Sequence, residues 1–252
     1  MRQIVKNEEP KSFALYRRNT KLSPTAKYDA SMQKDVNKEL RESLIKEQGY
    51  ICCYCMKRIL LQDNSSTKTK IEHFKPQSIY NGTNGKADLR LIYSNLFLAC
   101  KGEEFDDNNK QCNCCDSKKL HQELHFIDLL DESIEKKIKY SSSGAIFSNS
   151  ATIKDTDSNV ITCIDDEINK VLNLNNQSLK KWRKEVYNKI LLIIQNAEKR
   201  HKCNPTYLER LREEWYGKHE EEGKKMFKPF CMVAVYLIKK YIKKYEAIQN
   251  QS

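Results

Sequence analysis

Cysteines gather in one stretch of the chain, between residues 52 and 115, at spacings that are typical of a metal site. The stretch begins with a C-x2-C pair and ends with a denser group, and its cysteines include Cys52, Cys55, Cys100, Cys112, Cys114 and Cys115. A structural zinc ion takes four ligands in a tetrahedron, and two half-sites of this kind join segments that are distant in the sequence. The stretch therefore predicts a zinc-bound scaffold.

The four zinc ligands divide into two pairs. Cys52 and Cys55 form the first pair, because two thiolates at this spacing can face one ion across a tight turn. The favoured second pair is Cys100 with Cys115. Cys112 with Cys115, which is also a C-x2-C pair, is the alternative.

Disulfide formation is the other chemistry open to so many cysteines. The chain is rich in lysine, and its first residues, MRQIVKNEEPK, lack the apolar core of a secretory signal. A cytoplasmic location is therefore expected, where thiols stay reduced and bind metal. The longest apolar run, 230–238, is about half of the ~20 residues that a membrane helix requires, so no membrane contact is expected.

One histidine stands inside this cysteine frame, together with side chains that could act with it. His73 follows Glu72 in the segment EHFKP, Asn95 precedes Cys100, and Asp116 directly follows the last cysteine. A lone histidine is commonly structural, and a zinc ribbon without catalysis would also explain the cysteines. An imidazole, an amide and two carboxylates within one zinc frame favour a catalytic site instead.

At these residues the sequence resembles the HNH endonuclease family, in its zinc-bound branch. The match is carried by Cys52-x2-Cys55, Glu72-His73, Asn95-Leu96 before Cys100, and Cys115-Asp116-Ser117-Lys118-Lys119. The resemblance implies an α+β fold in which a two-stranded hairpin and a helix grip one divalent cation, the ββα-metal arrangement. It also implies hydrolysis of phosphodiester bonds, with DNA as the favoured substrate.

The resemblance implies a role for each matching residue. His73 would be the general base that deprotonates the attacking water, since a neutral imidazole with a pKa of about 6.5 suits this task. Asn95 would hold the hairpin loop and so orient His73. Glu72, His73 and Asp116 would bind catalytic Mg²⁺ or Mn²⁺, although the family usually has Asn or His where Asp116 stands. Lys119 would assist at a phosphate.

Weaker matches extend the resemblance beyond the nuclease core. They are Met1-Arg2-x-Ile4, Gln48-Gly49 and Leu172-Asn173-Leu174-Asn175. Together they look like the HNH proteins encoded beside retrons and in Septu-type anti-phage defence systems, where the nuclease is called PtuB. This resemblance implies a prokaryotic defence complex with an ABC/SMC-like ATPase (PtuA-like) as partner, and an association with a retron.

Positive charge is concentrated in the second half of the chain. The formal net charge is +11, and residues 177–252 contain 18 Lys and Arg against 9 Asp and Glu. Neutralisation of phosphates supplies the sequence-independent part of nucleic-acid binding, so this half could bind a polyanion. A lysine-rich proteome would give the same surplus, and charge alone does not decide between the two.

Several short elements are expected around the candidate site. Residues 67–74 alternate as a strand that ends with the EH pair, and residues 140–147 are expected to form a hairpin. A helix is expected from Asp116, with Leu120 and Leu124 on one face. His121 and His125, one turn apart on that helix, could reach a metal or could decorate its surface.

Apolar residues at helical spacing predict four longer helices. They cover 32–48, 179–197, 207–215 and a segment that starts near Pro229. The expected fold class is α+β, with a zinc-stabilised ββα-metal core and a helical C-terminal region. The expected domains are an N-terminal arm and helix (1–48), the zinc-bound nuclease core (49–128) and a mainly helical region (129–252).

Two other functions remain open at the level of sequence. A non-catalytic zinc module could bind nucleic acid or the ATPase without cutting anything. A stand-alone, restriction-like HNH nuclease would act without a partner.

Overall fold

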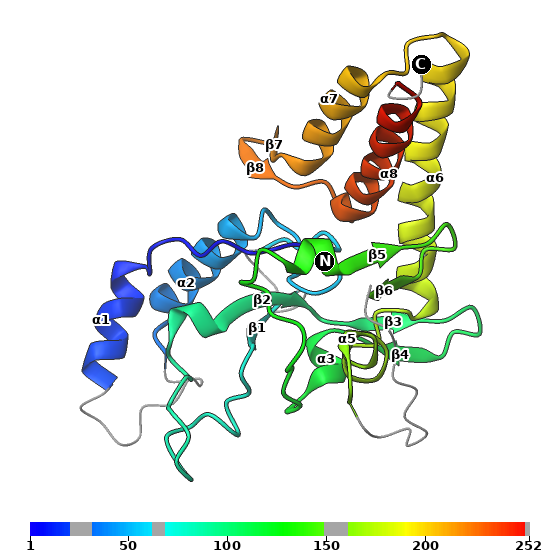
Figure 1. Cartoon of the computed structure of the whole chain (residues 1–252). Coiled ribbons are helices and arrows are strands. Elements are labelled where there is room, and N and C mark those ends of the chain that lie inside the picture. Colours follow the sequence, from blue (N-terminus) through cyan, green and yellow to red (C-terminus); the bar gives the residue numbers. More distant parts are fainter. Residues whose placement is uncertain (21–31, 62–68, 149–160, 250–252) are drawn as a thin grey trace.

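The computed structural model describes residues 1–20, 32–61, 69–148 and 161–249 and shows a mixture of helices and short strands (Figure 1). The elements up to residue 119 are α1 (Lys11–Thr20), α2 (Lys34–Glu47), β1 (Thr69–His73), the 3₁₀ turn η1 (Tyr93–Asn95), β2 (Leu96–Cys100), β3 (Glu103–Phe105), β4 (Gln111–Asn113) and α3 (Asp116–Lys119). The later elements are α4 (Ile134–Lys137), β5 (Ile138–Tyr140), β6 (Ile146–Ser148), α5 (Ile164–Asp166), the π-helix η2 (Glu167–Val171), α6 (Gln177–Lys199), α7 (Pro205–Tyr216), β7 (His219–Glu221), β8 (Lys224–Met226) and α8 (Cys231–Gln249). This mixed content agrees with the α+β class expected from the sequence.

The β1–β2 hairpin carries two of the candidate site residues, Glu72 and His73, at the end of β1. The two strands pair antiparallel, with Thr69 opposite Cys100 and His73 opposite Leu96. All five residues of β2 are buried, as expected for the apolar run LFLAC. The β3–β4 hairpin then separates β2 from α3, so the segment after Cys100 has its own two-stranded structure.

The C-terminal end of α2 anchors β2 through a side-chain amide. Gln48 Nε2 donates to the Leu98 carbonyl at 2.8 Å, and the Leu98 amide donates to Gln48 Oε1 at 2.7 Å. These two bonds imitate the pairing of a neighbouring strand, so the backbone amide and carbonyl of Leu98 both have hydrogen-bond partners. The helix is therefore docked on the hairpin in a fixed position.

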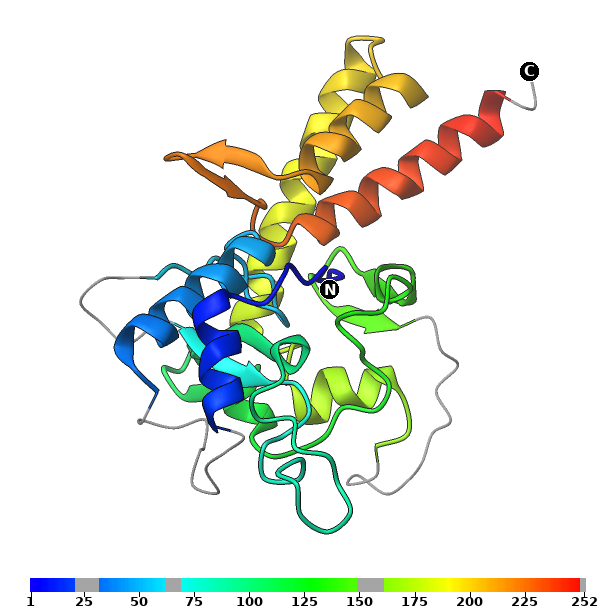
Figure 2. The same cartoon turned by 90° about the vertical axis from the view of Figure 1, so that its left-hand side faces the viewer.

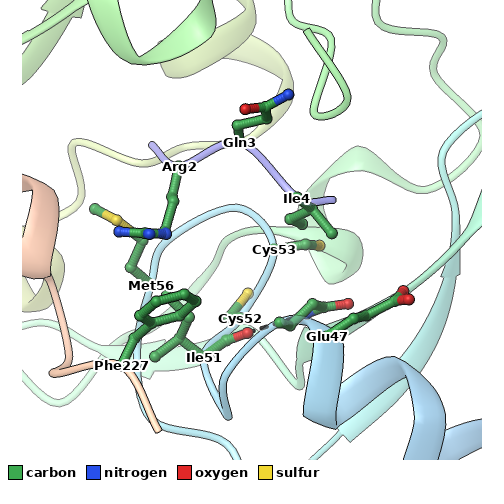
Figure 3. Close-up of a pocket in the computed structure, with 10 residues that line it drawn as sticks. Arg2, Gln3, Ile4, Glu47, Ile51, Cys52, Cys53, Met56 and Phe227 are labelled. Atoms are coloured by element: carbon green, nitrogen blue, oxygen red, sulfur yellow. Dashed lines mark hydrogen bonds between the residues drawn. The ribbon is translucent and has the colours of Figure 1, made fainter. Parts of the chain in front are cut away.

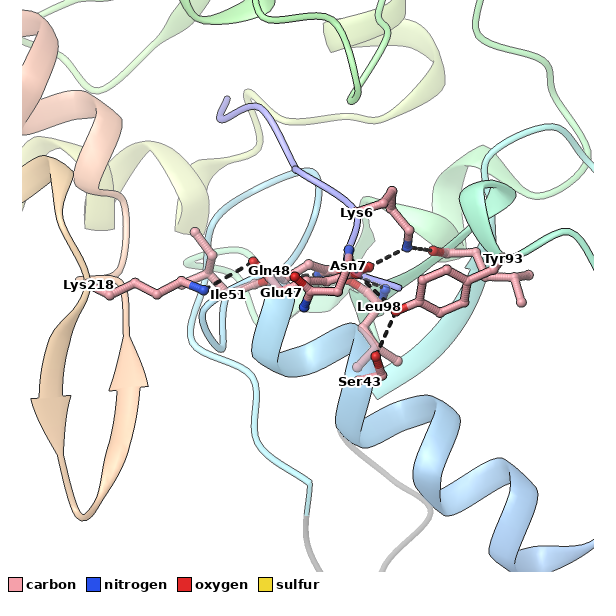
Figure 4. A network of polar contacts seen from close by, with 10 residues as sticks. Lys6, Asn7, Ser43, Glu47, Gln48, Ile51, Tyr93, Leu98 and Lys218 are labelled. Atoms are coloured by element: carbon pink, nitrogen blue, oxygen red, sulfur yellow. Dashed lines mark hydrogen bonds and ion pairs between the residues drawn. The ribbon is translucent and has the colours of Figure 1, made fainter. Parts of the chain in front are cut away.

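Glu47, the last residue of α2, is buried at the centre of a polar network (Figure 4). Its carboxylate forms an ion pair with Lys6 and accepts the Asn7 amide at 3.0 Å and the Tyr93 hydroxyl at 2.9 Å. Tyr93 also bonds Ser43 one turn earlier on α2, at 2.8 Å. Because a buried carboxylate requires several such partners, this network ties the N-terminal segment and η1 to α2.

The N-terminal segment also lies beside Cys52 and Cys53 (Figure 3). The Arg2 guanidinium lies 3.8 Å from the centre of the Phe227 ring and 4.1 Å from that of Tyr216, an arrangement typical of cation–π contacts. The pocket between Arg2, Phe227 and Cys52 has a volume of only about 10 Å³. It is a packing gap, too small for a small-molecule ligand, which takes ~300 Å³ or more.

The C-terminal region is helical, as expected. In Figures 1 and 2, α6 runs from the strand-containing part of the molecule into a projecting arm with α7. The last helix, α8, packs against both, and Tyr245 near its C-terminal end donates to Glu198 Oε1 of α6 at 2.9 Å. Asn176 and Asn204 cap α6 and α7 by accepting the amides of Leu179 and Tyr207. None of the helices in the described ranges is long and apolar enough to span a membrane.

A buried arginine connects α6 to the rest of the molecule. Arg183 is 1% exposed and donates to the Gly144 carbonyl at 2.7 Å and the Leu174 carbonyl at 2.6 Å. Gly144 lies in the turn of the β5–β6 hairpin, whose strands pair as expected from the sequence. Burial lowers the pKa of the guanidinium to about 10, so it stays charged at neutral pH.

The helix expected from Asp116 is much shorter than the sequence pattern indicates. It ends at Lys119, because Leu120 takes a left-handed conformation (φ 52°) and its side chain is 65% exposed. The amides of residues 125–127 instead donate to the carboxylate of Glu167, which is fully buried on η2. A continuous helix with Leu120 and Leu124 on one face is therefore wrong, since this distant carboxylate holds the chain in an extended path.

Gly102 permits a backbone contact that a side chain would block. It has φ +67°, its carbonyl accepts the Cys114 amide at 2.8 Å, and an added Cβ would lie 1.9 Å from the Cys114 carbonyl oxygen. Gly85 has a similar φ of +72° but would meet no atom within 4 Å. Both glycines therefore have a positive φ, but only Gly102, which is also buried, makes a close backbone contact.

We predict that Gly102→Ala lowers the Tm far more than Gly85→Ala. Both variants incur a left-handed alanine, which costs about 1–2 kcal/mol and lowers the Tm of a chain this size by about 2–4 °C per kcal/mol. Gly102→Ala additionally forces the backbone at Cys114 to move. Thermal denaturation followed by circular dichroism measures both, and an equal decrease of Tm in the two variants would contradict the prediction.

Candidate metal centre and the adjoining acid–base pocket

Four buried cysteines from three separate segments meet at one point. The Sγ atoms of Cys52, Cys55, Cys100 and Cys115 all lie within 4.8 Å of one another. Cys52 Sγ lies 3.9 Å from Cys115 Sγ, and Cys55 Sγ lies 3.8 Å from Cys100 Sγ. Zinc–sulfur bonds of about 2.3 Å at tetrahedral angles require sulfur separations of about 3.8 Å. The cluster therefore has the ligand type and the spacing of a structural zinc site.

The local backbone explains how the first pair forms. Met56 adopts a left-handed conformation (φ 64°) directly after Cys55, which reverses the chain so that both thiols face the same side. The amide of Lys57 donates to Cys55 Sγ at 3.4 Å, and the amide of Cys100 donates to Cys52 Sγ at 3.3 Å. Such donors stabilise sulfur in the thiolate form in which it binds metal.

The second pair is brought together by the β3–β4 hairpin. The bond between Gly102 and Cys114 closes the base of this hairpin and brings Cys115 back towards Cys100. Cys112 lies on β4 outside the cluster, where its sulfur contacts Asn173 Nδ2 at 3.3 Å. Of the two second pairs considered from the sequence, the structure brings together Cys100 and Cys115 and leaves Cys112 apart.

His73 lies at the end of β1 with its ring largely buried, at 8% exposure. Its Nε2 atom is 3.0 Å from the Arg90 carbonyl oxygen, which can only accept a hydrogen bond. The proton of a neutral ring is therefore on Nε2, and Nδ1 carries the lone pair. Burial lowers the pKa of His73 below its usual value, so the ring is neutral at neutral pH.

Asn95 closes the long connection between β1 and β2. Its Oδ1 accepts the Lys75 amide at 2.7 Å, and its Nδ2 donates to the carbonyls of Lys75 and Leu89, each at 3.1 Å. One side chain thus bonds both ends of the connection. Since Leu89 directly precedes Arg90, the same bonds fix the carbonyl that holds the His73 ring.

Glu72 is a buried carboxylate next to the zinc-type cluster. It accepts the Tyr54 hydroxyl at 2.7 Å, and Tyr54 lies between the cysteines of the first pair. Burial and a hydrogen bond to the Asp116 carboxyl raise the pKa of Glu72 to about 8, against the opposing effect of Lys119. Two carboxyl groups in contact need a proton or a cation between them, and hard oxygen ligands suit Mg²⁺ or Mn²⁺.

The structure gives Lys119 a different environment from the one expected at a phosphate. Its side chain is 1% exposed, and its ammonium lies 2.7 Å from Glu72 Oε1 and 3.1 Å from the His73 carbonyl oxygen. A buried ammonium in contact with a carboxylate cannot also reach a substrate in solvent. Lys119 therefore neutralises Glu72 and supports the strand that carries His73.

A surface pocket of about 180 Å³ lies beside these residues, and Glu72, His73, Asp116 and His121 are among its lining residues. Asp116 directly follows the zinc-type ligand Cys115, so the cluster fixes its position. The left-handed turn at Leu120 brings His121 to the pocket. His125 is exposed and is not among the lining residues.

Among the described residues, only the four cysteines form a set of three or more His, Cys, Asp or Glu side chains whose ligand atoms could surround one ion. Glu72, His73 and Asp116 do not form such a set. Mg²⁺ keeps several of its waters and needs only one or two protein carboxylates. The contacting carboxyl groups of Glu72 and Asp116 fit this requirement.

Comparison with known proteins is consistent with this arrangement. No family model matches the chain. The protein named "Retron Vc95 putative HNH endonuclease" from Vibrio cholerae serotype O1 biovar El Tor is 28% identical over 159 residues, which cover 63% of this chain and 68% of that protein. The "Retron Ec83 putative HNH endonuclease" from Escherichia coli is 35% identical over 89 residues, 34% of this chain and 33% of that protein. These relatives support an HNH endonuclease family.

Some residues of this candidate site are not apparent from the motifs. Tyr54 and Lys70 bond the two pocket carboxylates, and the Arg90 carbonyl contacts the His73 ring. Lys70 could have been found from the sequence, because alternation along a strand places it on the same face as Glu72. The Arg90 carbonyl carries no sequence signal, since any residue could supply it.

We predict that Cys115→Ser removes the bound zinc and lowers the Tm, whereas Cys112→Ser changes neither. Serine is a poor zinc ligand, and structural zinc sites contribute directly to the free energy of folding. Elemental analysis of purified protein measures the zinc content, and thermal denaturation measures the Tm. Zinc loss in the Cys112 variant with retention in the Cys115 variant would reverse the ligand assignment.

Proposed function

We propose that the protein is a metal-dependent HNH endonuclease that hydrolyses phosphodiester bonds, with DNA as the favoured substrate. In this proposal β1, β2 and α3 form the ββα-metal core, and the four cysteines hold a structural zinc ion. The observation that carries the proposal is the shared pocket of His73, Glu72 and Asp116 beside the four-thiol cluster. The HNH names of the two relatives support the same activity.

His73 would act as the general base. Its lone pair on Nδ1 accepts the proton of the attacking water, while the bond from Nε2 to the Arg90 carbonyl keeps the ring in place. Asn95 fixes the connection that contains Arg90, so it is a positioning residue. The positive charge that develops on the ring is stabilised by the nearby Asp116 carboxylate.

Glu72 and Asp116 would hold the catalytic Mg²⁺ or Mn²⁺. When bound, this cation supplies electrostatic stabilisation of the negative charge that develops on the phosphate and the leaving oxygen. Tyr54 and Lys119 hold the Glu72 carboxylate in the pocket, and Cys115 fixes the backbone next to Asp116. The zinc-type cluster thus positions both carboxylates.

The names of the relatives and the motifs outside the core support a proposal for the biological setting. Both relatives are named as retron proteins. We place the nuclease in a prokaryotic anti-phage defence complex of retron or Septu type, as a PtuB-like effector. An ABC/SMC-like ATPase of the PtuA type would be its partner.

We predict that His73→Ala abolishes cleavage while the zinc content and the Tm are kept. Loss of a general base lowers the rate by about 10²–10⁴-fold. The matched control is His125→Ala, which removes an exposed imidazole that does not line the pocket. Cleavage of duplex DNA with Mg²⁺ or Mn²⁺ is measured on gels. A His73 variant that cuts at the wild-type rate would show that His73 is not the general base, whereas a wild-type protein that binds nucleic acid without cutting it would favour a non-catalytic zinc module.

The basic surplus of the second half includes a compact patch on α8. Lys239, Lys240, Lys243 and Lys244 are exposed, and their spacing places them on one side of the helix. None of these four forms an ion pair with an acidic side chain in the described part of the chain. Like charges one turn apart repel, so a polyanion bound here would relieve that repulsion. We assign this patch to the nucleic-acid backbone.

We predict that replacing the four α8 lysines by glutamine weakens nucleic-acid binding and its dependence on salt. For duplex DNA, the slope of log K against log salt falls by about 0.9 for each phosphate that the protein no longer neutralises. Fluorescence anisotropy in the His73→Ala background measures binding without cleavage. The matched control replaces four exposed lysines elsewhere: Lys11, Lys34, Lys38 and Lys46. Equal slopes in both variants would assign the α8 patch to protein contacts.

A further inference from the structure

The pocket lined by Glu72, His73 and Asp116 is called here the acid–base pocket. Each of its two carboxylates contacts one lysine. Lys119 Nζ lies 2.7 Å from Glu72 Oε1, and Lys70 Nζ lies 3.3 Å from Asp116 Oδ2. The two lysines differ in exposure, because the side chain of Lys119 is 1% exposed whereas that of Lys70 is 42% exposed. Lys119 is therefore fixed in the interior, and Lys70 can leave its carboxylate for solvent or a ligand.

Lys70 is held loosely at the edge of the pocket. It comes from β1, two residues before Glu72, and its ammonium also donates to Ser117 Oγ at 2.8 Å. Ser117 in turn donates to the Lys101 carbonyl. An exposed ion pair of this kind contributes only about 0–1 kcal/mol. Little free energy therefore opposes release of Lys70 from Asp116.

A divalent cation at the pocket and the Lys70 ammonium would compete for Asp116. Both are positive, and both need the same carboxylate oxygens within a few ångströms. A cation bound to Asp116 would thus repel the ammonium, which can swing on its flexible four-carbon stem. Phosphate is the anion that a lysine in this position meets in a nuclease, and lysine binds it as a point charge.

We propose that Lys70 holds Asp116 until a cation binds and then transfers its ammonium to a phosphate oxygen of the substrate. This inference rests on the proposed nuclease function. It makes Lys70 both a competitor of the cation and a substrate contact. Removal of the Lys70 charge should therefore tighten cation binding and weaken DNA cleavage. An ion pair with a purely structural role would not produce these opposite changes.

Lys70→Gln tests both roles in the full chain. Removal of the competing ammonium is expected to tighten Mn²⁺ binding about two- to fivefold, the equivalent of a weak surface ion pair. Without the ammonium at the phosphate, kcat/KM for DNA cleavage is expected to fall roughly tenfold or more. Isothermal titration with Mn²⁺ alone measures the first effect, and gel assays at saturating Mn²⁺ measure the second. Lys70→Arg, which keeps the charge, is expected to retain wild-type Mn²⁺ affinity and most of the activity.

Lys118→Gln is the matched control, because Lys118 is exposed on the same short helix as Asp116 and forms no ion pair among the described residues. It is expected to change neither quantity. Zinc content and Tm confirm that each variant is folded. Unchanged or weaker Mn²⁺ binding in Lys70→Gln, or undiminished cleavage, overturns the inference. A wild-type protein that cleaves no nucleic acid overturns the proposed function itself, which separates the two failures.

Discussion

The four buried thiols are the constraint on which the rest of the candidate site depends. Their sulfur atoms lie within 4.8 Å of one another, and four thiolates, the form that binds zinc, would repel at that distance unless a cation lay between them. Metal binding in small zinc domains contributes about 10–16 kcal/mol, which is comparable to the ~5–15 kcal/mol that stabilises a whole domain. Zinc would therefore hold together β2, α3 and the first cysteine pair.

The acid–base pocket depends on this cluster through two short connections. Asp116 is covalently next to Cys115, and Tyr54, which lies between Cys52 and Cys55, bonds Glu72 at 2.7 Å. Asp116 is thus one residue away from the sulfur ligand Cys115. Glu72 is one hydrogen bond away from Tyr54, a chain neighbour of the sulfur ligand Cys55. A rigid sulfur cluster can in this way position oxygen ligands closely enough for chemistry, although it takes no part in the chemistry itself.

Buried charges elsewhere fasten the surrounding segments in the same manner. Glu47 joins the N-terminal segment to α2, Glu167 holds the amides after α3, and Arg183 connects α6 to the β5–β6 hairpin. Each charge is buried with several hydrogen bonds, because an unpaired charge in the interior would cost several kcal/mol. The apolar core is continuous through all these segments, so the helical arm and the pocket are parts of one packed structure.

By itself, the sequence determined the features that local patterns encode, namely the longer helices and the choice of cysteines for the cluster. Helical periodicity gave α2, α6, α7 and α8, and the spacing of the cysteines favoured the four that meet. Only the tertiary structure decided that α3 stops at Lys119, that Lys119 is buried against Glu72, and that Lys70 contacts Asp116. The β7–β8 hairpin likewise was not expected. The physical reason is that periodicity records which face of an element is buried, whereas these features depend on a charge or a backbone group that arrives from a distant part of the chain.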